Sequence, residues 1–147
     1  MRLICWNLAR YVSRLPEQAA AVAEAQPDVV AFQEVTAATV PLWRHALTSI
    51  GLPHVATSLD TADPKREPPG PRRHGTLVAS REPIQTLDDR PWDPPWPESV
   101  LSVRLHDGTE VHSAHVPNAR NGQIKPQTCE ALTHGLATGA ERRILCG

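Results

Sequence analysis

Two short apolar runs of this chain each end in a side chain that can bind a metal ion or a phosphate group. The run Leu3–Trp6 leads into Asn7, and the run Val29–Gln33 leads into Glu34. Apolar runs of this length, with a helical stretch between them, are typical of neighbouring buried strands in an α/β sheet. Such sheets present their ligand-binding groups at the carboxyl ends of the strands. We therefore expect a carboxylate and a carboxamide to meet at one edge of the sheet.

Each of these two residues also has an ordinary structural interpretation. Glu34 stands before Thr36, where a carboxylate can stabilise the start of a helix through the helix dipole. Asn7 can cap a helix or close a turn, because asparagine readily hydrogen-bonds to nearby backbone groups. The interpretation as a site is favoured only because both side chains are expected at the same place.

The composition is that of one globular domain without a strong overall charge. The chain has 147 residues, of which 40% are hydrophobic, so a core of domain size can form. Its 15 basic residues nearly balance its 16 acidic residues. No net charge attracts nucleic acid or a membrane surface, so recognition of an anion must be local.

The cysteines and the N-terminal residues indicate a compartment. Cys5, Cys129 and Cys146 form no Cys-x-x-Cys pair, which argues against zinc, and two of them lie in apolar strand runs. We therefore expect reduced thiols in the core. No apolar stretch approaches the length of a signal peptide or a membrane span, so the prediction is a cytoplasmic location.

Hydrophobic spacing predicts a helix on each side of the second strand in the chain. One apolar stripe precedes Pro27 and contains Leu15, Ala19, Val22 and Ala23. A second helix is expected between Pro41 and Gly51, with a stripe of Trp43, Ala46, Leu47 and Ile50. Right-handed crossover connections place both helices on one face of the sheet.

Further strands are expected in the middle of the chain. Gly75–Ser80 is predicted as a strand, with Ile84–Leu87 as its weak partner. Asp107-Gly108 lies between the alternating runs Val100–Leu105 and Thr109–Val116, which is typical of a hairpin. The sheet is therefore mixed.

The end of the chain adds one helix and one strand. Pro126 can open a helix, and the apolar run Arg143–Cys146 is expected as a strand. A loop between Pro64 and Pro71 is rich in proline, and the basic residues in and beside it are interpreted as solvated rather than as phosphate contacts: Lys65, Arg66, Arg72 and Arg73.

In the order and spacing of its motifs, the chain resembles the N-terminal half of the endonuclease/exonuclease/phosphatase superfamily, which has the deoxyribonuclease-I-like fold. The resemblance rests on Trp6-Asn7, Gln33-Glu34-Val35-Thr36, Gly75 to Ser80 with Arg81-Glu82-Pro83, His115-Val116-Pro117-Asn118 with Gly122 and Lys125 downstream, and Ile144-Leu145-Cys146-Gly147. It implies an α/β fold in which a mixed β-sheet carries helices on one face, as half of a four-layer sandwich.

The resemblance also implies a magnesium site, with manganese as a substitute. In relatives the glutamate that matches Glu34 holds the metal ion, and the asparagine that matches Asn7 hydrogen-bonds near the metal and its phosphate. Magnesium prefers oxygen ligands, keeps several waters and typically takes only one or two carboxylates from a protein. The single negative charge of Glu34 is therefore enough, from the protein, for a magnesium site.

Three residues further along the chain are candidates for contact with the substrate. In relatives the asparagine that matches Asn118 contacts the phosphate, and the position of His115 holds an aromatic residue or a histidine whose ring can hydrogen-bond to it. Lys125 is expected beside the same phosphate. The alternative for His115 is a histidine at the solvent edge, and the alternative for Lys125 is an exposed basic residue that needs no explanation.

Relatives carry further catalytic residues in segments that would lie past Gly147: an Asp-x-Asn motif and an Asp-His pair. We therefore expect residues 1–147 to form a truncated domain that is inactive by itself. Relatives also pack a second sheet on the first. The missing half is expected to supply that second sheet, so one apolar face of the chain is expected to stay exposed to water, including Leu101, Val103 and Leu105.

The resulting prediction is a metal-dependent phosphodiesterase, of nuclease type, that acts on a phosphodiester or phosphomonoester such as nucleic acid. Ala9 argues against the branch that handles abasic DNA, because those nucleases often have a carboxylate two residues after the asparagine. The alternatives are a phosphatase or phospholipid diesterase of the same family, a non-catalytic remnant that binds phosphate or nucleic acid, and a coding frame that continues. DNA, RNA, phosphoinositide and sphingolipid all stay open as substrates, as does the oligomeric state.

Overall fold

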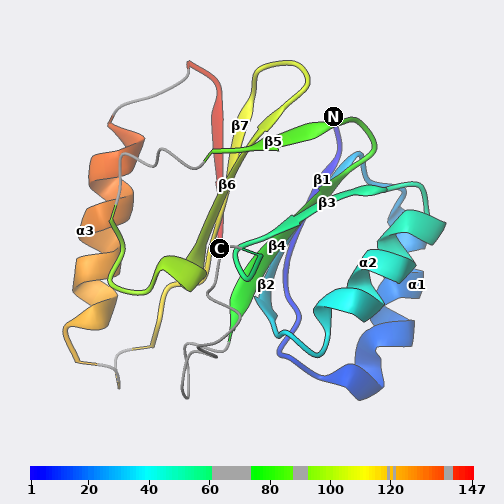
Figure 1. Ribbon diagram of the computed structural model, residues 1–147, viewed down its shortest axis with the longest axis horizontal. Coiled ribbons are helices and arrows are strands. Elements are labelled where there is room, and N and C mark those ends of the chain that lie inside the picture. The colour runs from blue at the N-terminus through cyan, green and yellow to red at the C-terminus, as the bar shows by residue number, and fades with distance from the viewer. Residues whose placement is uncertain (61–73, 88–92, 119, 121, 138–140) are drawn as a thin grey trace.

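The computed structural model shows two β-sheets that pack face to face between helices (Figure 1). It describes residues 1–60, 74–87, 93–118, 120, 122–137 and 141–147. The basic side chains of the proline-rich loop, Lys65, Arg66, Arg72 and Arg73, lie outside the described residues. None of the helices in these ranges has the length and hydrophobicity needed to cross a membrane.

The first sheet has the strand order β1-β2-β4-β3. Its strands are β1 (Leu3–Asn7), β2 (Val29–Val35), β3 (His54–Thr57) and β4 (Gly75–Ser80). β1 runs parallel to β2, whereas β4 runs antiparallel to both β2 and β3. The expected mixed sheet is confirmed.

The second sheet has the strand order β5-β6-β7-β8. Its strands are β5 (Ile84–Thr86), β6 (Val100–Leu105), β7 (Glu110–Ala114) and β8 (Arg143–Cys146). β6 and β7 form the predicted hairpin, in which Gly108 has a φ of +82° and the Asp107 carboxylate accepts the Thr109 amide at 3.0 Å. A left-handed glycine and an aspartate side chain that closes the turn explain the strength of the Asp-Gly signal.

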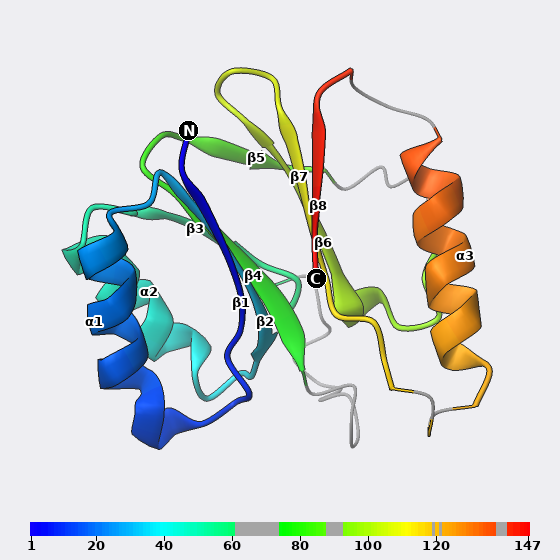
Figure 2. The same ribbon diagram turned by 180° about the vertical axis from the view of Figure 1, so that it is seen from behind.

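Helices cover the outer face of each sheet (Figure 2). α1 (Leu15–Ala25) and α2 (Val40–Ser49) pack on the first sheet, and α3 (Ile124–Leu136) packs on the second. The short 3-10 helices η1 (Val12–Arg14) and η3 (Pro97–Ser99) precede α1 and β6. The layers are therefore helix, sheet, sheet and helix, and the predicted α/β class is confirmed.

Alternation along β2 explains how the first sheet fills two cores. Val30 and Phe32 face the helices, where the Phe32 ring meets the Trp43 ring edge-on at 4.9 Å between centroids. Val29 and Ala31 point the other way, into the core between the two sheets. Because side chains of a strand alternate between its faces, one apolar run supplies both cores.

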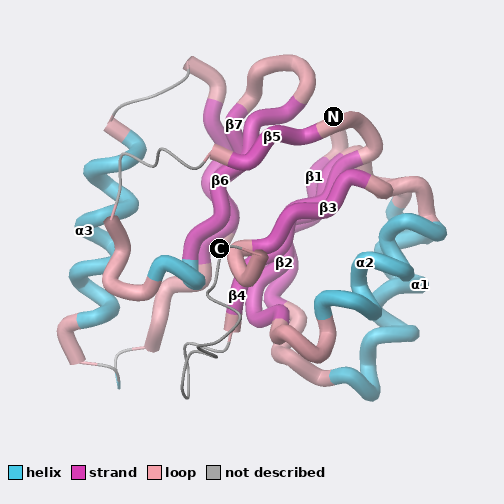
Figure 3. The backbone as a smooth tube through the Cα atoms, in the orientation of Figure 1, coloured by secondary structure: helices cyan, strands magenta, loops and turns pink. Residues whose placement is uncertain are grey.

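The expectation of an uncovered apolar face is wrong. Leu101, Val103 and Leu105 are only 2%, 0% and 8% exposed, because they pack in one cluster with Val29 and Val78 of the first sheet. The chain therefore supplies both facing sheets itself. The smooth tube in Figure 3 shows the two groups of strands lying beside each other.

Two smaller expectations are also corrected. The strand that begins at Ile84 pairs with β6 of the second sheet, with Ile84 opposite Leu105, and not with Gly75–Ser80. The turn after Ser80 thus carries the chain from one sheet to the other. Cys146 is a buried thiol as expected, but Cys5 and Cys129 are exposed, because β1 is an edge strand and Cys129 lies on the outer side of α3.

Replacement of Leu101 tests the packing between the two sheets. Leu101→Ala is expected to lower the free energy of unfolding by about 2–5 kcal/mol, since it removes buried methyl groups and leaves a cavity. Urea denaturation followed by circular dichroism measures this loss. The matched control is Leu145→Ala on β8, where the side chain is 46% exposed, and a change within about 0.5 kcal/mol is expected. Equal losses in the two variants would contradict the packing described.

Candidate metal and phosphate site

The parallel pairing of β1 with β2 brings Asn7 and Glu34 together, as the sequence predicted. In this register Asn7 lies opposite Gln33, so Glu34 is the next residue along the neighbouring strand. The Asn7 Nδ2 donates a hydrogen bond to Glu34 Oε1 at 3.1 Å, and the Asn7 Oδ1 accepts one from the Ala9 amide at 3.0 Å. Both ends of the carboxamide are therefore used, and its amide group is fixed toward the carboxylate.

Glu34 has an unusual backbone conformation for a residue with a side chain. Its φ is +59°, and the pairing of β2 with β4 shifts register between Gln33 and Val35. The left-handed region costs a residue other than glycine about 1–2 kcal/mol. A register shift of this kind turns a side chain away from the regular sheet. Ala9 and Arg10 have φ values of +52° and +56°, so strained backbone flanks the Asn7–Glu34 pair on both strands.

The buried side chain of Gln33 holds the end of β2 in place through hydrogen bonds. Gln33 is 2% exposed, and its Nε2 donates to the Ser113 Oγ of the second sheet at 3.0 Å and to the Ala31 carbonyl at 3.2 Å. The Cys5 thiol donates to Gln33 Oε1 at 3.7 Å. The strand end that carries Glu34 is thus tied to both β1 and β7. Mutually satisfied buried polar groups of this kind hold a single arrangement.

Two histidines lie near this pair, one from each sheet. His115 follows β7, and its backbone amide donates to the Ser99 carbonyl at 2.8 Å. His74 precedes β4, and its ring meets the His115 ring edge-on with 6.3 Å between centroids. The His74 Nε2 lies 3.3 Å from the Arg10 Nη1. Because a guanidinium can only donate, the His74 Nε2 must accept, and the ring proton then sits on Nδ1.

Both histidines are held neutral by their surroundings. Burial lowers the pKa of His115, and the Glu34 carboxylate acts in the opposite direction. Burial also lowers the pKa of His74, where Glu34 again opposes the shift while Arg10 and His115 add to it. Neutral rings can donate or accept a hydrogen bond at neutral pH. Since the charge of Glu34 acts on both rings, the carboxylate and the two histidines lie within electrostatic range of one another.

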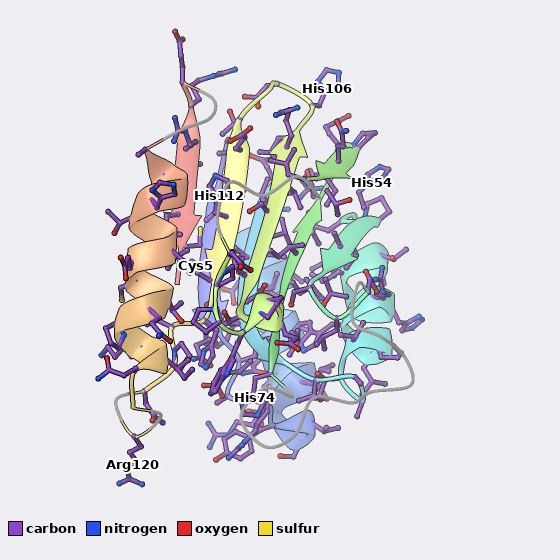
Figure 4. The ribbon with its side chains drawn as sticks, turned by 60° about the vertical axis from the view of Figure 1, so that its left-hand side comes forward. Cys5, His54, His74, His106, His112 and Arg120 are labelled. Atoms are coloured by element: carbon purple, nitrogen blue, oxygen red, sulfur yellow. The ribbon has the colours of Figure 1, made fainter. Side chains whose placement is uncertain are left out.

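Asn118 and Lys125 occupy the loop and helix that follow β7. The Asn118 Oδ1 accepts a hydrogen bond from the backbone amide of Arg120 at 3.0 Å, and Lys125 is exposed in the first turn of α3. Figure 4 shows Arg120 and His74 at the same end of the molecule, with His54 and His106 toward the other end. The phosphate-binding roles of Asn118 and Lys125 stay predictions.

Sequence reasoning assigned no role to His74 and none to Arg10. The signal for His74 was available, because it directly precedes the predicted strand Gly75–Ser80. That strand runs antiparallel to β2, so its first residues must lie beside the carboxyl end of β2, where Glu34 is. Arg10 follows Asn7 by three residues, but no sequence pattern indicates the left-handed backbone that brings its guanidinium to His74.

The site presents one oriented carboxylate, that of Glu34. Within the described ranges, no group of three or more His, Cys, Asp or Glu side chains is placed to hold a metal ion. Glu34 Oε2 accepts no hydrogen bond from the described residues, while Asn7 holds Oε1. A single oriented carboxylate with one open oxygen fits an ion that keeps most of its waters.

Two mixed sheets that pack face to face between helices are the architecture of the deoxyribonuclease-I-like fold. The family model described as "Endonuclease/Exonuclease/phosphatase family" matches residues 5–147, so the chain belongs to that family. The family includes nucleases and phosphatases, which are hydrolases. No curated protein matches the chain in sequence.

Solved structures share the fold at low sequence identity. An AP endonuclease from Archaeoglobus fulgidus is 24% identical with a TM-score of 0.75, and the match covers 100% of this chain and 56% of that one. A 3'-5' exonuclease, NExo, from Neisseria meningitidis is 22% identical with a TM-score of 0.69, over 92% and 51% of the two chains. TDP2 from D. rerio, complexed with a single-strand DNA product, is 16% identical with a TM-score of 0.67, over 99% and 58%. This chain thus spans about half the length of each, and the similarity establishes the fold alone.

Replacement of Glu34 by its uncharged isostere tests whether the carboxylate and the histidines share a site. In Glu34→Gln the pKa values of His74 and His115 are expected to fall, because the negative charge that favours both protonated rings is gone. Proton NMR titration of the ring resonances measures both values. The control Glu82→Gln removes an exposed carboxylate from the turn between β4 and β5 and should leave both rings unchanged. Unmoved histidines in Glu34→Gln would contradict the shared site.

Proposed function

We propose that this chain carries the metal- and phosphate-binding part of a magnesium-dependent phosphodiesterase of nuclease type. The observation that carries the proposal is the Asn7–Glu34 hydrogen bond at the end of two parallel strands, beside two histidines that burial keeps neutral. Family membership supports it, because members of the family are hydrolases. Three similar structures support phosphodiester chemistry: an AP endonuclease, an exonuclease and a complex of TDP2 with a DNA product.

Each residue of the site has a distinct part in this proposal. Glu34 holds magnesium, or manganese in its place, and Asn7 orients the carboxylate through Oε1. A bound divalent ion supplies positive charge that stabilises the charge developing on a phosphoryl oxygen. His115, as a neutral ring, donates a hydrogen bond to the phosphate. Asn118 donates from its carboxamide, and Lys125 contributes a positive charge at the start of α3.

Two further parts of the proposal concern the whole protein. We propose that residues 1–147 correspond to the first half of a domain of this family, because the chain covers 56% of the similar AP endonuclease. We also propose a cytoplasmic location, for which the support is three cysteines that are free thiols. Substrate recognition is proposed for a phosphodiester, with nucleic acid as the favoured class.

A second candidate function is phosphate binding without turnover. It is favoured by the neighbours of His115 in the part of the chain that the structure describes, since the carboxylate that acts on its ring there is Glu34, the proposed metal ligand. A histidine that activates water normally has an orienting acid of its own. Hydrolysis of a generic aryl phosphodiester by the purified chain, absent in Glu34→Gln, would exclude this second candidate.

Titration with magnesium tests the role of Glu34. Isothermal calorimetry of the purified chain is expected to show binding that Glu34→Gln removes, because the isostere keeps the shape and loses the charge. Asn7→Ala is expected to weaken binding by about 10–100-fold, since it frees the carboxylate that Asn7 orients. Glu82→Gln serves as the control for loss of one negative charge elsewhere. Equal affinity for magnesium in the native chain and in Glu34→Gln would contradict the proposal.

A further inference from the structure

Two cysteines from opposite ends of the chain border the layer between the two sheets. Cys5 is on β1 and Cys146 is on β8, and each of these strands is an edge strand of its sheet. Figure 2 shows β1 and β8 on the same side of the sandwich. Burial raises the pKa of the Cys146 thiol, and the Cys5 thiol adds to this rise, so the two side chains lie near each other.

The surroundings of the two thiols confirm that they border one cluster. Cys5 donates to Gln33 Oε1 at 3.7 Å, and Gln33 Nε2 donates to Ser113 Oγ at 3.0 Å. Ser113 is the residue of β7 that lies directly opposite Cys146 in the parallel register of β7 and β8. The hydrogen bonds from Cys5 through Gln33 to Ser113 therefore cross from the first sheet to the second. There Ser113 lies beside Cys146 on the neighbouring strand.

We propose that Cys5 and Cys146 form a reversible disulfide that links the two sheets beneath the Asn7–Glu34 pair. A peroxide is the oxidant. One molecule of hydrogen peroxide converts the Cys5 thiol to a sulfenic acid and releases one water. The Cys146 thiol then attacks the Cys5 sulfur, the S–S bond forms, the S–O bond breaks, and the hydroxyl leaves with the thiol proton as a second water. A dithiol reductant returns both thiols.

The environments of the two sulfur atoms assign the order of these steps. Cys5 is exposed, so an oxidant reaches it first. Cys146 is 5% exposed, and burial raises the pKa of its thiol to about 11, so it stays protonated until Cys5 is oxidised beside it. To form a disulfide, the two sulfur atoms must approach to about 2.05 Å. Disulfides that connect the two sheets of a sandwich are known in immunoglobulin domains.

Peptide mapping of the oxidised chain identifies the bond directly. Trypsin separates the two cysteines, because Cys5 lies on peptide 3–10 and Cys146 on peptide 144–147, while Cys129 lies on peptide 121–142. After treatment with hydrogen peroxide and blocking of free thiols, we expect a cross-linked peptide of 3–10 with 144–147 that dithiothreitol separates. The same treatment should raise the thermal midpoint of the native chain, since the bond closes a loop over nearly the whole sequence.

Three variants separate this bond from nonspecific oxidation. Cys129→Ser keeps the cross-linked peptide and the increase in thermal midpoint, because that exposed thiol lies on α3 and not between the sheets. Cys5→Ser and Cys146→Ser lose both. Cys5 oxidised beyond sulfenic acid with Cys146 still free, a bond that includes Cys129, or a disulfide between two molecules would each overturn the proposal. None of these outcomes depends on metal binding, so the proposed function is tested separately.

Discussion

The parallel pairing of β1 with β2 determines where the functional side chains of this protein lie. A parallel pair places two carboxyl ends at the same edge, and this register sets Asn7 opposite Gln33 with Glu34 one residue beyond. A shift of one residue in β2 would send Glu34 to the other face of the sheet. The alternate residues Val30 and Phe32 pack under the helices, while Val29 and Ala31 pack between the sheets, so burial on both faces fixes the register. The core thus holds the polar pair in place.

The same strand end carries backbone strain that the surrounding packing supports. Glu34 adopts a left-handed conformation next to Gln33, whose side chain is buried and bonded to Ser113 of the second sheet. Strain of this kind persists only where neighbouring contacts over-determine the backbone, and it concentrates at functional sites. The contact from Gln33 to β7 also explains why His115, the residue that follows β7, lies within reach of the Glu34 charge. The packing between the two sheets therefore also brings the residues of the site together.

The sequence predicted the parts of the fold that depend on local pattern. The helices, the Asp107-Gly108 hairpin and the meeting of Asn7 with Glu34 all follow from apolar spacing, turn chemistry and the geometry of parallel strands. The covering of Leu101 and Val103 was predicted wrongly, because an apolar run shows that a strand is buried but does not show which partner buries it. The same limit applies to the strand at Ile84, which pairs in the second sheet.

The site was predicted only as far as strand ends could indicate it. Arg10 joins His74 through two consecutive left-handed residues, and such a conformation in alanine and arginine has no signal in residue type. His115 joins through contact between sheets, which depends on the packing and not on local spacing. Burial, likewise, lowers the pKa of both histidines only once the sheets have assembled.

The central claim is that one cation binds at the edge where β1 and β2 end. Manganese is paramagnetic and broadens NMR signals of nuclei close to it, so substoichiometric manganese added to the isotope-labelled chain locates the ion directly. The account predicts that the side-chain amide of Asn7 and the rings of His74 and His115 broaden first, while His54 and His106 at the other end of the molecule stay sharp (Figure 4). A pocket between the start of β2, the β4–β5 turn and the β6–β7 hairpin is lined by the carboxylates of Asp28, Glu82 and Asp107. Broadening that begins around these carboxylates instead would contradict the account.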